Sequence, residues 1–188
     1  MTHVQASIEE AVKTIESLRA LEEKITLAAG VVRDCLGQGG KLMACGNGGS
    51  AGDVSDFTTE YACRFVHDRL PFPAINLTAD GSLLTATGND YGFDEIFARQ
   101  VQAFGKTGDV LVVASTSGRS KNIVRALEEA NRLQLQSIAL LGKGGGQAKG
   151  LATVELVVPG QVTARIQEAH KFMLHLICEL VEPSLHTK

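Results

Sequence analysis

The sequence has few cysteines, and their spacing excludes two kinds of small protein. No two of them form a C-x-x-C pair or a zinc-finger pattern, so neither a disulfide-stapled fold nor a zinc finger is expected. Free thiols are typical of a reducing compartment, so this pattern predicts a cytoplasmic protein. The four cysteines are Cys35, Cys45, Cys63 and Cys178.

The sequence also lacks a basic excess and any long apolar run. Lysine and arginine number 18 against 21 aspartates and glutamates, for a net charge of -3. This balance argues against a nucleic-acid partner, which would require a basic surface. Residues 1–25 carry several charges and no apolar core, unlike a signal peptide. No run approaches the length of a membrane-spanning helix, so no membrane association is expected.

The composition is that of one globular domain of ordinary size. The chain has 188 residues, of which 44% are hydrophobic and 21% charged. A chain of this length buries a sizeable core without disulfides. We therefore expect residues 1–188 to form a single domain, with a helical segment over 1–40 that packs on the core or on a neighbouring subunit.

Apolar segments alternate with amphipathic ones along the chain, which predicts β-α-β crossovers and a mostly parallel sheet buried on both faces. Ligands of such sheets gather at the carboxyl ends of the strands. The expected strands are 41–45, 74–77, 109–115, 137–142 and 154–159. The expected helices are 4–20, 22–37, 50–65, 81–88, 92–104, 120–133 and 162–182.

Two strand-to-helix turns carry small polar residues, "ACGNGGS" at 44–50 and "ASTSGRS" at 114–120. Glycine lets the backbone approach an anion, and a helix N-terminus offers free N–H groups with a partial positive charge. Together with hydroxyl donors, such a turn holds a phosphate without a cationic side chain. The hydroxyls of the second turn belong to Ser115, Thr116, Ser117 and Ser120.

Other interpretations of these turns are weaker. Ser50 and Ser120 would serve equally well as helix caps, and Ser50 with Asp53 fits a capping box. Four hydroxyls within six residues favour the phosphate site. The "GNGGSA" at 46–51 matches a dinucleotide fingerprint, but no acid closes the next strand at the usual offset. The "GKT" at 105–107 precedes a strand and lacks the first Walker glycine. No nucleotide cofactor is therefore expected.

Three acids follow the first turn within eight residues: Asp53, Asp56 and Glu60. On a helix they lie within about 60° of one another, so they share one face. The alternative is a solvated acidic face, with Asp53 favoured by the helix dipole. Against that alternative, the same segment carries an apolar stripe that packs the helix, made of Phe57, Tyr61 and Phe65.

The last helix supplies further candidates. Gln167 and His175 lie about 80° apart around its axis, whereas His170 lies on a different side. A histidine in an apolar helix is more often a core residue than a catalyst. A partly buried imidazole beside a carboxylate nevertheless makes an acid/base pair near neutral pH, which raises the interest of His175.

These residues together resemble the sugar isomerase (SIS) domain family, and within it the phosphoheptose isomerases, which act on sedoheptulose 7-phosphate. The resemblance covers nearly the whole chain. It rests on a set of motifs in order and at family spacing, which is far more specific than any one of them. The motifs are "GNGGSA", "TATGNDYGFDEIFARQV", "GDVLVVASTSGRSKNI", "GKGGG" and "ARIQEAH" followed by His175.

The resemblance implies a flavodoxin-like three-layer sandwich, with a parallel five-stranded sheet, N-terminal helices and a long C-terminal helix. It also implies a homotetramer with sites at subunit interfaces. Glu60 and His175 take the acid and base positions, with Gln167 beside them. The implied sugar contacts are Asn47, Gly48, Gly49, Asn89 and Asp90, and the implied phosphate contacts are Ser115, Thr116, Ser117 and Ser120.

Some members of the family bind zinc through a His, a Glu, a Gln and a His. Glu60, Gln167 and His175 match three of these, but Asp56 stands where the family usually has histidine. Aspartate is also a zinc ligand. One zinc ion per subunit is therefore expected at these four residues, with a metal-free site, in which Asp56 raises the pKa of Glu60, as the alternative.

The implied reaction is an aldose-ketose isomerisation by proton transfer through an enediol. It would convert sedoheptulose 7-phosphate to D-glycero-D-manno-heptose 7-phosphate, a heptose precursor for lipopolysaccharide, capsule or another glycan. The alternative is a non-catalytic SIS-domain protein that binds a replication initiator or senses a sugar phosphate. The initiator-binding relative lacks the terminal-helix histidine, so His175 and Glu60 favour the enzyme.

Overall fold

Five apolar segments pair into one sheet in the computed structural model, which describes residues 1–185 of the chain. All pairings are parallel, in the order β2-β1-β3-β4-β5. The strands are β1 (Leu42–Gly46), β2 (Ala74–Asn76), β3 (Val110–Ser115), β4 (Gln136–Gly142) and β5 (Val154–Val158). Their order and the flanking helices confirm the expected flavodoxin-like sandwich.

The register of the two central strands positions the candidate site. Gly46 at the end of β1 lies opposite Ala114 near the end of β3. The chain leaves β1 towards β2 on one side and leaves β3 towards β4 on the other. The carboxyl ends of β1 and β3 therefore flank the switch point of the sheet, where ligands of this architecture bind.

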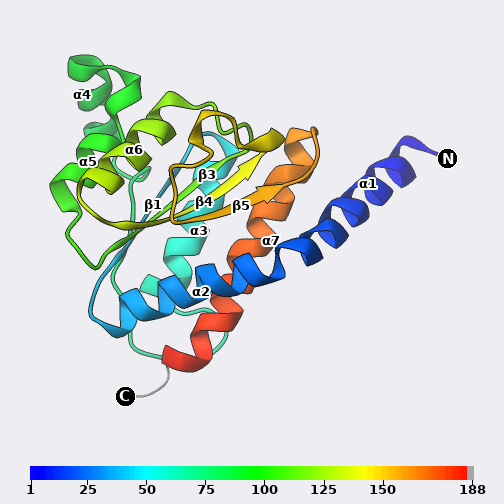
Figure 1. Cartoon of the computed structure of the whole chain (residues 1–188), viewed down its shortest axis with the longest axis horizontal. Helices are drawn as coiled ribbons and strands as arrows, with labels where there is room; N and C mark the ends of the chain where they lie inside the picture. The colour runs from blue at the N-terminus through cyan, green and yellow to red at the C-terminus, as the bar shows by residue number, and fades with distance from the viewer. Residues whose placement is uncertain (186–188) are drawn as a thin grey trace.

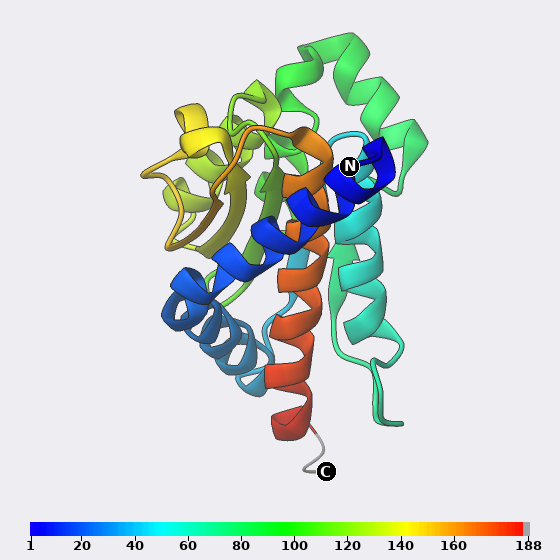
Figure 2. The same ribbon diagram turned by 90° about the vertical axis from the view of Figure 1, so that its right-hand side faces the viewer.

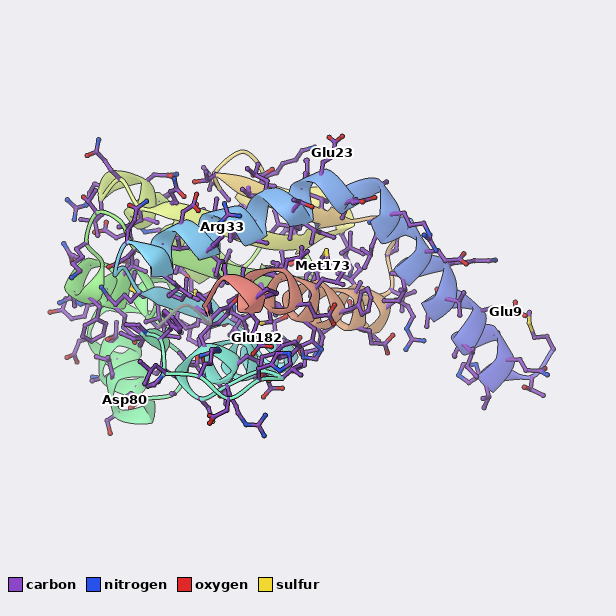
Figure 3. The ribbon with its side chains drawn as sticks, turned by 90° about the horizontal axis from the view of Figure 1, so that it is seen from below. Glu9, Glu23, Arg33, Asp80, Met173 and Glu182 are labelled. Atoms are coloured by element: carbon purple, nitrogen blue, oxygen red, sulfur yellow. The ribbon has the colours of Figure 1, made fainter. Side chains whose placement is uncertain are left out.

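Helices cover both faces of the sheet because successive strand residues point to opposite sides. Leu42 and Ala44 pack in one apolar cluster with α2, α3 and α7, whereas Met43 and Cys45 pack in the other with α5 and α6. Figure 3 shows α7, on which Met173 is labelled, between α2 and α3. The helices are α1 (His3–Ser17), α2 (Glu22–Gly37), α3 (Gly49–Ala62), α4 (Gly81–Tyr91), α5 (Ala98–Phe104), α6 (Lys121–Arg132) and α7 (Thr163–Val181).

The first helix stands apart from the body of the molecule. α1 contains no buried residue, and it projects beyond the sheet and the other helices (Figures 1 and 3). It nevertheless contacts α7, where the guanidinium of Arg165 donates to the carbonyl oxygen of Ser7 at 2.9 Å. α2, by contrast, buries an apolar face in the core.

Four expected helices have different ends in the structure. The helix expected over 4–20 is α1 followed by a 3-10 turn, Leu18–Leu21, and the one expected over 81–88 runs on to Tyr91. The helix expected over 50–65 stops at Ala62, because the Arg69 guanidinium and the N–H of Phe72 occupy carbonyl groups of its last turn. The helix expected over 92–104 is divided into a 3-10 turn, Phe93–Glu95, and α5. In α5 the side-chain amide of Gln100 donates to two backbone carbonyls and ties the segment to the end of β2.

None of the helices within residues 1–185 combines the length and the apolar character needed to cross a membrane.

One histidine of α7 belongs to the core. His170 is fully buried, and its Nε2 lies 3.1 Å from the carbonyl oxygen of Leu141 in β4. Because a carbonyl only accepts, Nε2 carries the proton of a neutral ring. Burial lowers the pKa of His170 to about 4, although the hydrogen bond to Leu141 opposes the shift. His170 therefore has the core role that is usual for a histidine in an apolar helix, and it lies on a different side of α7 from His175.

We predict that His170 makes the fold acid-sensitive. The folded-state pKa of His170 lies below the ordinary value of 6.5. The stabilisation of the fold by the neutral ring is therefore complete above pH 6.5 and is lost as the pH falls towards 4. The lost contribution is roughly 3 kcal/mol in the free energy of unfolding. Urea titrations of the wild type and His170→Gln from pH 7 to 4 measure it. The variant should be less stable at pH 7 but lose less on acidification, whereas His3→Gln, on exposed α1, should follow the wild type.

Candidate functional site

The two polar turns meet at the switch point of the sheet. The side-chain amides of Asn47, after β1, and Asn122, in the first turn of α6, exchange two hydrogen bonds of 2.9 Å each. Asn122 is buried, so this pair is protected from competing water. The pair fixes the glycine turn against the helix that follows the serine turn. The sugar contacts expected in the glycine turn and the phosphate contacts expected in the serine turn are therefore neighbours in space.

The serine turn brings two of its hydroxyls side by side. The Oγ of Ser115 accepts from the N–H of Gly118 at 3.1 Å and lies 3.5 Å from the Oγ of Ser120. The Oγ of Ser117 accepts from the N–H of Arg119 at 3.2 Å. Thr116, Ser117 and Ser120 are half-buried, which leaves them accessible to a ligand. This clustering is the arrangement that an anion site requires.

The capping alternative for these serines does not hold. Ser120 occupies the N-cap position of α6, but its side chain makes no capping hydrogen bond. Ser50 lies inside the first turn of α3, whose N-cap is Gly48, and no side chain caps that helix. The capping box of Ser50 with Asp53 is therefore absent, and Asp53 is available for another role.

Glycines allow a second loop to close behind the serine turn. Gly118 has a φ of 60°, and a Cβ at this position would lie 1.8 Å from the carbonyl oxygen of Gly145. Gly146 has a φ of 54°, and its Cβ would lie 2.6 Å from the carbonyl oxygens of both Ser117 and Gly118. The "GKGGG" loop after β4 thus supports the serine turn by backbone contact that no larger residue permits.

The remaining polar candidates lie on α3 and α7, which run side by side away from the carboxyl edge of the sheet (Figure 2). The side chain of Gln167 on α7 lies very close to Gly49. A Cβ at Gly49 would lie 2.3 Å from the side-chain nitrogen of Gln167. Each helix presents a row of polar side chains to the space between them, which we call the α3–α7 groove. The rows are Asp53, Asp56 and Glu60 on α3, and Gln167, Lys171 and His175 on α7.

Asp53 is the most buried of the three acids, at 9% exposure, and its Oδ2 has no hydrogen-bond partner within residues 1–185. Burial raises its pKa, as does the charge of Asp56, whereas Lys171 and Gln167 oppose the shift. Asp53 and these two residues of α7 line a shallow pocket of about 390 Å³. A buried carboxylate oxygen without a partner, on a residue that lines a pocket, is characteristic of a ligand site.

Glu60 and His175 continue the two polar rows further from the sheet edge, on helical spacing. The carbonyl oxygen of Glu60 accepts from Arg69, which leaves its half-buried carboxylate for other contacts. Burial raises the pKa of the Cys178 thiol to about 12, and the nearby Glu60 charge adds to this shift. His175 lies one turn before Cys178 on the same helix, with its ring 6.0 Å from that of Phe65. The groove thus places the two expected acid/base residues on facing helices.

The zinc ion remains a prediction, and its proposed ligands fit it poorly. Asp56 forms an ion pair with Lys171 across the groove, so a lysine ammonium already stands where the cation would bind. Within residues 1–185, no three His, Cys, Asp or Glu side chains converge closely enough to hold a metal ion.

Two expected sugar contacts lie apart from the groove. Asn89 and Asp90 are exposed on α4, where the amide of Asn89 donates to the carboxylate of Asp90 at 2.8 Å. α4 packs chiefly against the turn Phe93–Glu95 that follows it, and it projects from the side of the molecule that carries α5 and α6 (Figure 1). Their role as sugar contacts stays a prediction.

Sequence reasoning missed Lys171 and gave no site role to Asp53. The signal for Lys171 was its position four residues after Gln167 and four before His175, which places all three on one helix face. The signal for Asp53 was its shared face with Asp56 and Glu60, which was outweighed by the capping interpretation.

The family of the chain follows from two kinds of comparison. The SIS domain family matches residues 6–142. The phosphoheptose isomerase of Bordetella avium is 49% identical over 173 residues, which is 90% of this chain and 88% of that protein. That of Shewanella loihica is 47% identical over 174 residues, covering 91% and 88%. The chain belongs to the phosphoheptose isomerase family of SIS-domain enzymes.

Solved structures of phosphoheptose isomerases agree with this assignment. The enzyme of Francisella tularensis superposes with a TM-score of 0.93 at 40% identity, over 97% of this chain and all 100% of the other. That of Neisseria gonorrhoeae gives 0.88 at 41% identity, over 96% and 97%. The family and fold expected from the sequence motifs are confirmed.

We predict that Gly118→Ala disrupts the serine turn of this isomerase. The new Cβ would collide with the carbonyl of Gly145, so the turn must move, and the free energy of unfolding should fall by more than about 3 kcal/mol. Gly144→Ala is the matched control, because Gly144 also has a positive φ, of 80°, but an open space at its Cβ. It should lose only about 1 kcal/mol. Equal losses in urea unfolding would contradict the close-contact explanation.

Proposed function

We propose that this chain converts sedoheptulose 7-phosphate to D-glycero-D-manno-heptose 7-phosphate. The observation that carries the proposal is the continuity of three features: the serine turn, the glycine turn and the α3–α7 groove. A hydroxyl cluster for an anion, a backbone turn for sugar hydroxyls and a carboxylate–imidazole pair match the two ends of a sugar phosphate. Its relatives named phosphoheptose isomerase support the same reaction class.

The serine turn binds the phosphate. The hydroxyls of Ser115 and Ser120 lie 3.5 Å apart at the N-terminus of α6, and Ser117 belongs to the same turn. The free N–H groups of that helix end add a partial positive charge. Such a site holds the substrate equally well before and after the reaction, so it contributes to binding more than to the chemical step.

Glu60 and His175 perform the proton transfers. With the phosphate anchored at the sheet edge, the sugar extends along the groove and brings its C1 and C2 between the two helices. Glu60 moves the carbon-bound proton between C1 and C2, and His175 moves the oxygen-bound proton between O1 and O2. No step changes the net redox state, so no nucleotide cofactor is required. Zinc at Asp56 is assigned no step, because its ligands fit it poorly.

The proposed product is a heptose phosphate that feeds a glycan such as lipopolysaccharide, and we assign the reaction to the cytoplasm, where free thiols persist.

We also propose that the enzyme is a homo-oligomer, with a tetramer as the expected form. Val4, Ile8 and Val12 form an exposed apolar stripe on α1, with exposures of 66%, 57% and 50%. The stripe leads to an apolar pocket of about 420 Å³ between α1, α2 and α7, which Phe172 and Leu176 help to line. Contiguous exposed apolar surface of this kind marks an interface with another chain.

We predict that Glu60→Gln and His175→Ala each lower kcat by at least about 100-fold, the usual effect of losing a general acid or base. The half-buried positions of both residues suggest that the fold survives, which melting temperatures would check. Turnover of sedoheptulose 7-phosphate, followed by NMR of the product, is the measurement. A non-catalytic SIS protein would show no turnover in the wild type, and near-normal turnover in a variant would remove that residue from its role.

For the oligomer, we predict that Ile8→Glu lowers the mass measured by light scattering after size exclusion. A carboxylate in an apolar interface loses hydration without gaining a partner, which weakens assembly. Glu10→Lys is the control, because it changes the charge on the opposite side of the same helix and should leave the mass unaltered. A wild-type protein that elutes as a monomer at micromolar concentration would contradict the proposal.

A further inference from the structure

Lys171 is placed at the centre of the α3–α7 groove. It lies one helical turn after Gln167 and one before His175, so it shares their face of α7. Its ammonium pairs with Asp56 on the facing helix, and its side chain is 28% exposed. It also lines the pocket beside Asp53, so its charge reaches both acids nearest the sheet edge.

The charges around the groove require a cation. Asp53, Asp56 and Glu60 bring three carboxyl groups to one side, and the arginines Arg69 and Arg165 bind elsewhere. Arg69 donates to backbone carbonyls and lies near the buried Glu182, and Arg165 pairs with Glu168. Once Glu60 has taken the C1 proton it is neutral, so the enediolate forms beside the carboxyl groups of Asp53 and Asp56. It would be disfavoured there unless a positive charge faced its oxygen.

We propose that Lys171 is the electrophile of this site, held by Asp56 in the place that a metal ion takes in other members of the family. The proposal rests on the isomerase function proposed above. Asp56 serves either partner, since a carboxylate binds an ammonium or a divalent ion but not both at close range. The aspartate that replaces the usual histidine is thereby explained: histidine suits zinc, whereas aspartate suits a lysine.

The step is balanced in atoms and electrons. Glu60 removes a proton from C1, the C1–H electron pair becomes the C1–C2 double bond, and the π pair of the C2 carbonyl moves onto O2. The ammonium of Lys171 donates a hydrogen bond to O2 and keeps its own proton. His175 transfers the O1 proton to O2, and Glu60 returns its proton to C2, which leaves an aldehyde at C1.

The first experiment compares Lys171→Met, Lys171→Arg and wild type on sedoheptulose 7-phosphate, after treatment with a chelator. Lys171→Met keeps the length of the side chain and removes the charge. It should lower kcat by about 100-fold or more, with KM changed less than about threefold, because the interaction forms only in the transition state. The kcat of Lys171→Arg should be at least tenfold higher than that of Lys171→Met. Lys24→Met, on the exposed surface of α2, should behave as wild type.

A second experiment measures binding, which does not depend on turnover. A phosphorylated hydroxamic acid that mimics the enediolate should bind Lys171→Met at least tenfold more weakly than wild type in calorimetry, whereas inorganic phosphate should bind both equally. Zinc chloride should bind Lys171→Met at least tenfold more tightly than wild type, because the substitution releases Asp56.

The outcomes separate this proposal from the function on which it rests. A wild type without turnover contradicts the isomerase function. A chelated wild type that regains activity only with zinc, or a Lys171→Met that keeps its kcat, leaves the isomerase function intact and overturns the role of Lys171. Zinc that binds wild type as tightly as Lys171→Met also overturns it, because the ion would then not compete with the ammonium.

Discussion

The pairing of β1 with β3 is the constraint on which the site depends. Because parallel pairing sets Gly46 opposite Ala114, the two strands end at one level. The chain turns into a helix after each strand, so these two helices begin beside each other. The hydrogen bonds between Asn47 and Asn122 fix that proximity. A slip of one residue would reverse the faces of a strand that is buried throughout, so the apolar core enforces the register. Core packing and ligand geometry are therefore set by the same pairing.

The second requirement is the close packing of α7 against α3. Gly49 allows the side chain of Gln167 to reach the start of α3 at a distance that any Cβ would prevent. Further along, Ile166, Met173 and Ile177 anchor α7 in the core that α2 and the sheet complete. With the apolar side of α7 fixed in this way, its polar row necessarily faces the acids of α3. The groove results from two amphipathic helices that share one buried layer.

Much of this arrangement could be predicted from the sequence, because it follows from local patterns. The alternation of apolar strands and helices predicted the five strands and their parallel direction, and the serine turn was placed correctly at a strand end. The flavodoxin-like arrangement of the strands came from the family resemblance. The end of α3 could not be predicted, since it depends on Arg69 folding back onto the carbonyls of Glu60 and Tyr61. The pairing of Asp56 with Lys171 was equally hidden, because the two residues are 115 positions apart in the chain and meet only after α7 packs.

The distribution of unsatisfied polar groups separates the functional part of the molecule from the rest. Within residues 1–185, the buried side-chain atoms without a hydrogen bond belong to Asp53 and Tyr61 on α3, Arg165 and His170 on α7, and Arg69, which closes α3. Each such atom costs about 1–3 kcal/mol, whereas an apolar side chain at the same place would cost nothing. Tyr61 and His170 carry this cost in the core, where His170 faces β4. Asp53 differs from them because it also lines the pocket beside Gln167 and Lys171, and a cost kept at a pocket is explained if that pocket takes a polar ligand.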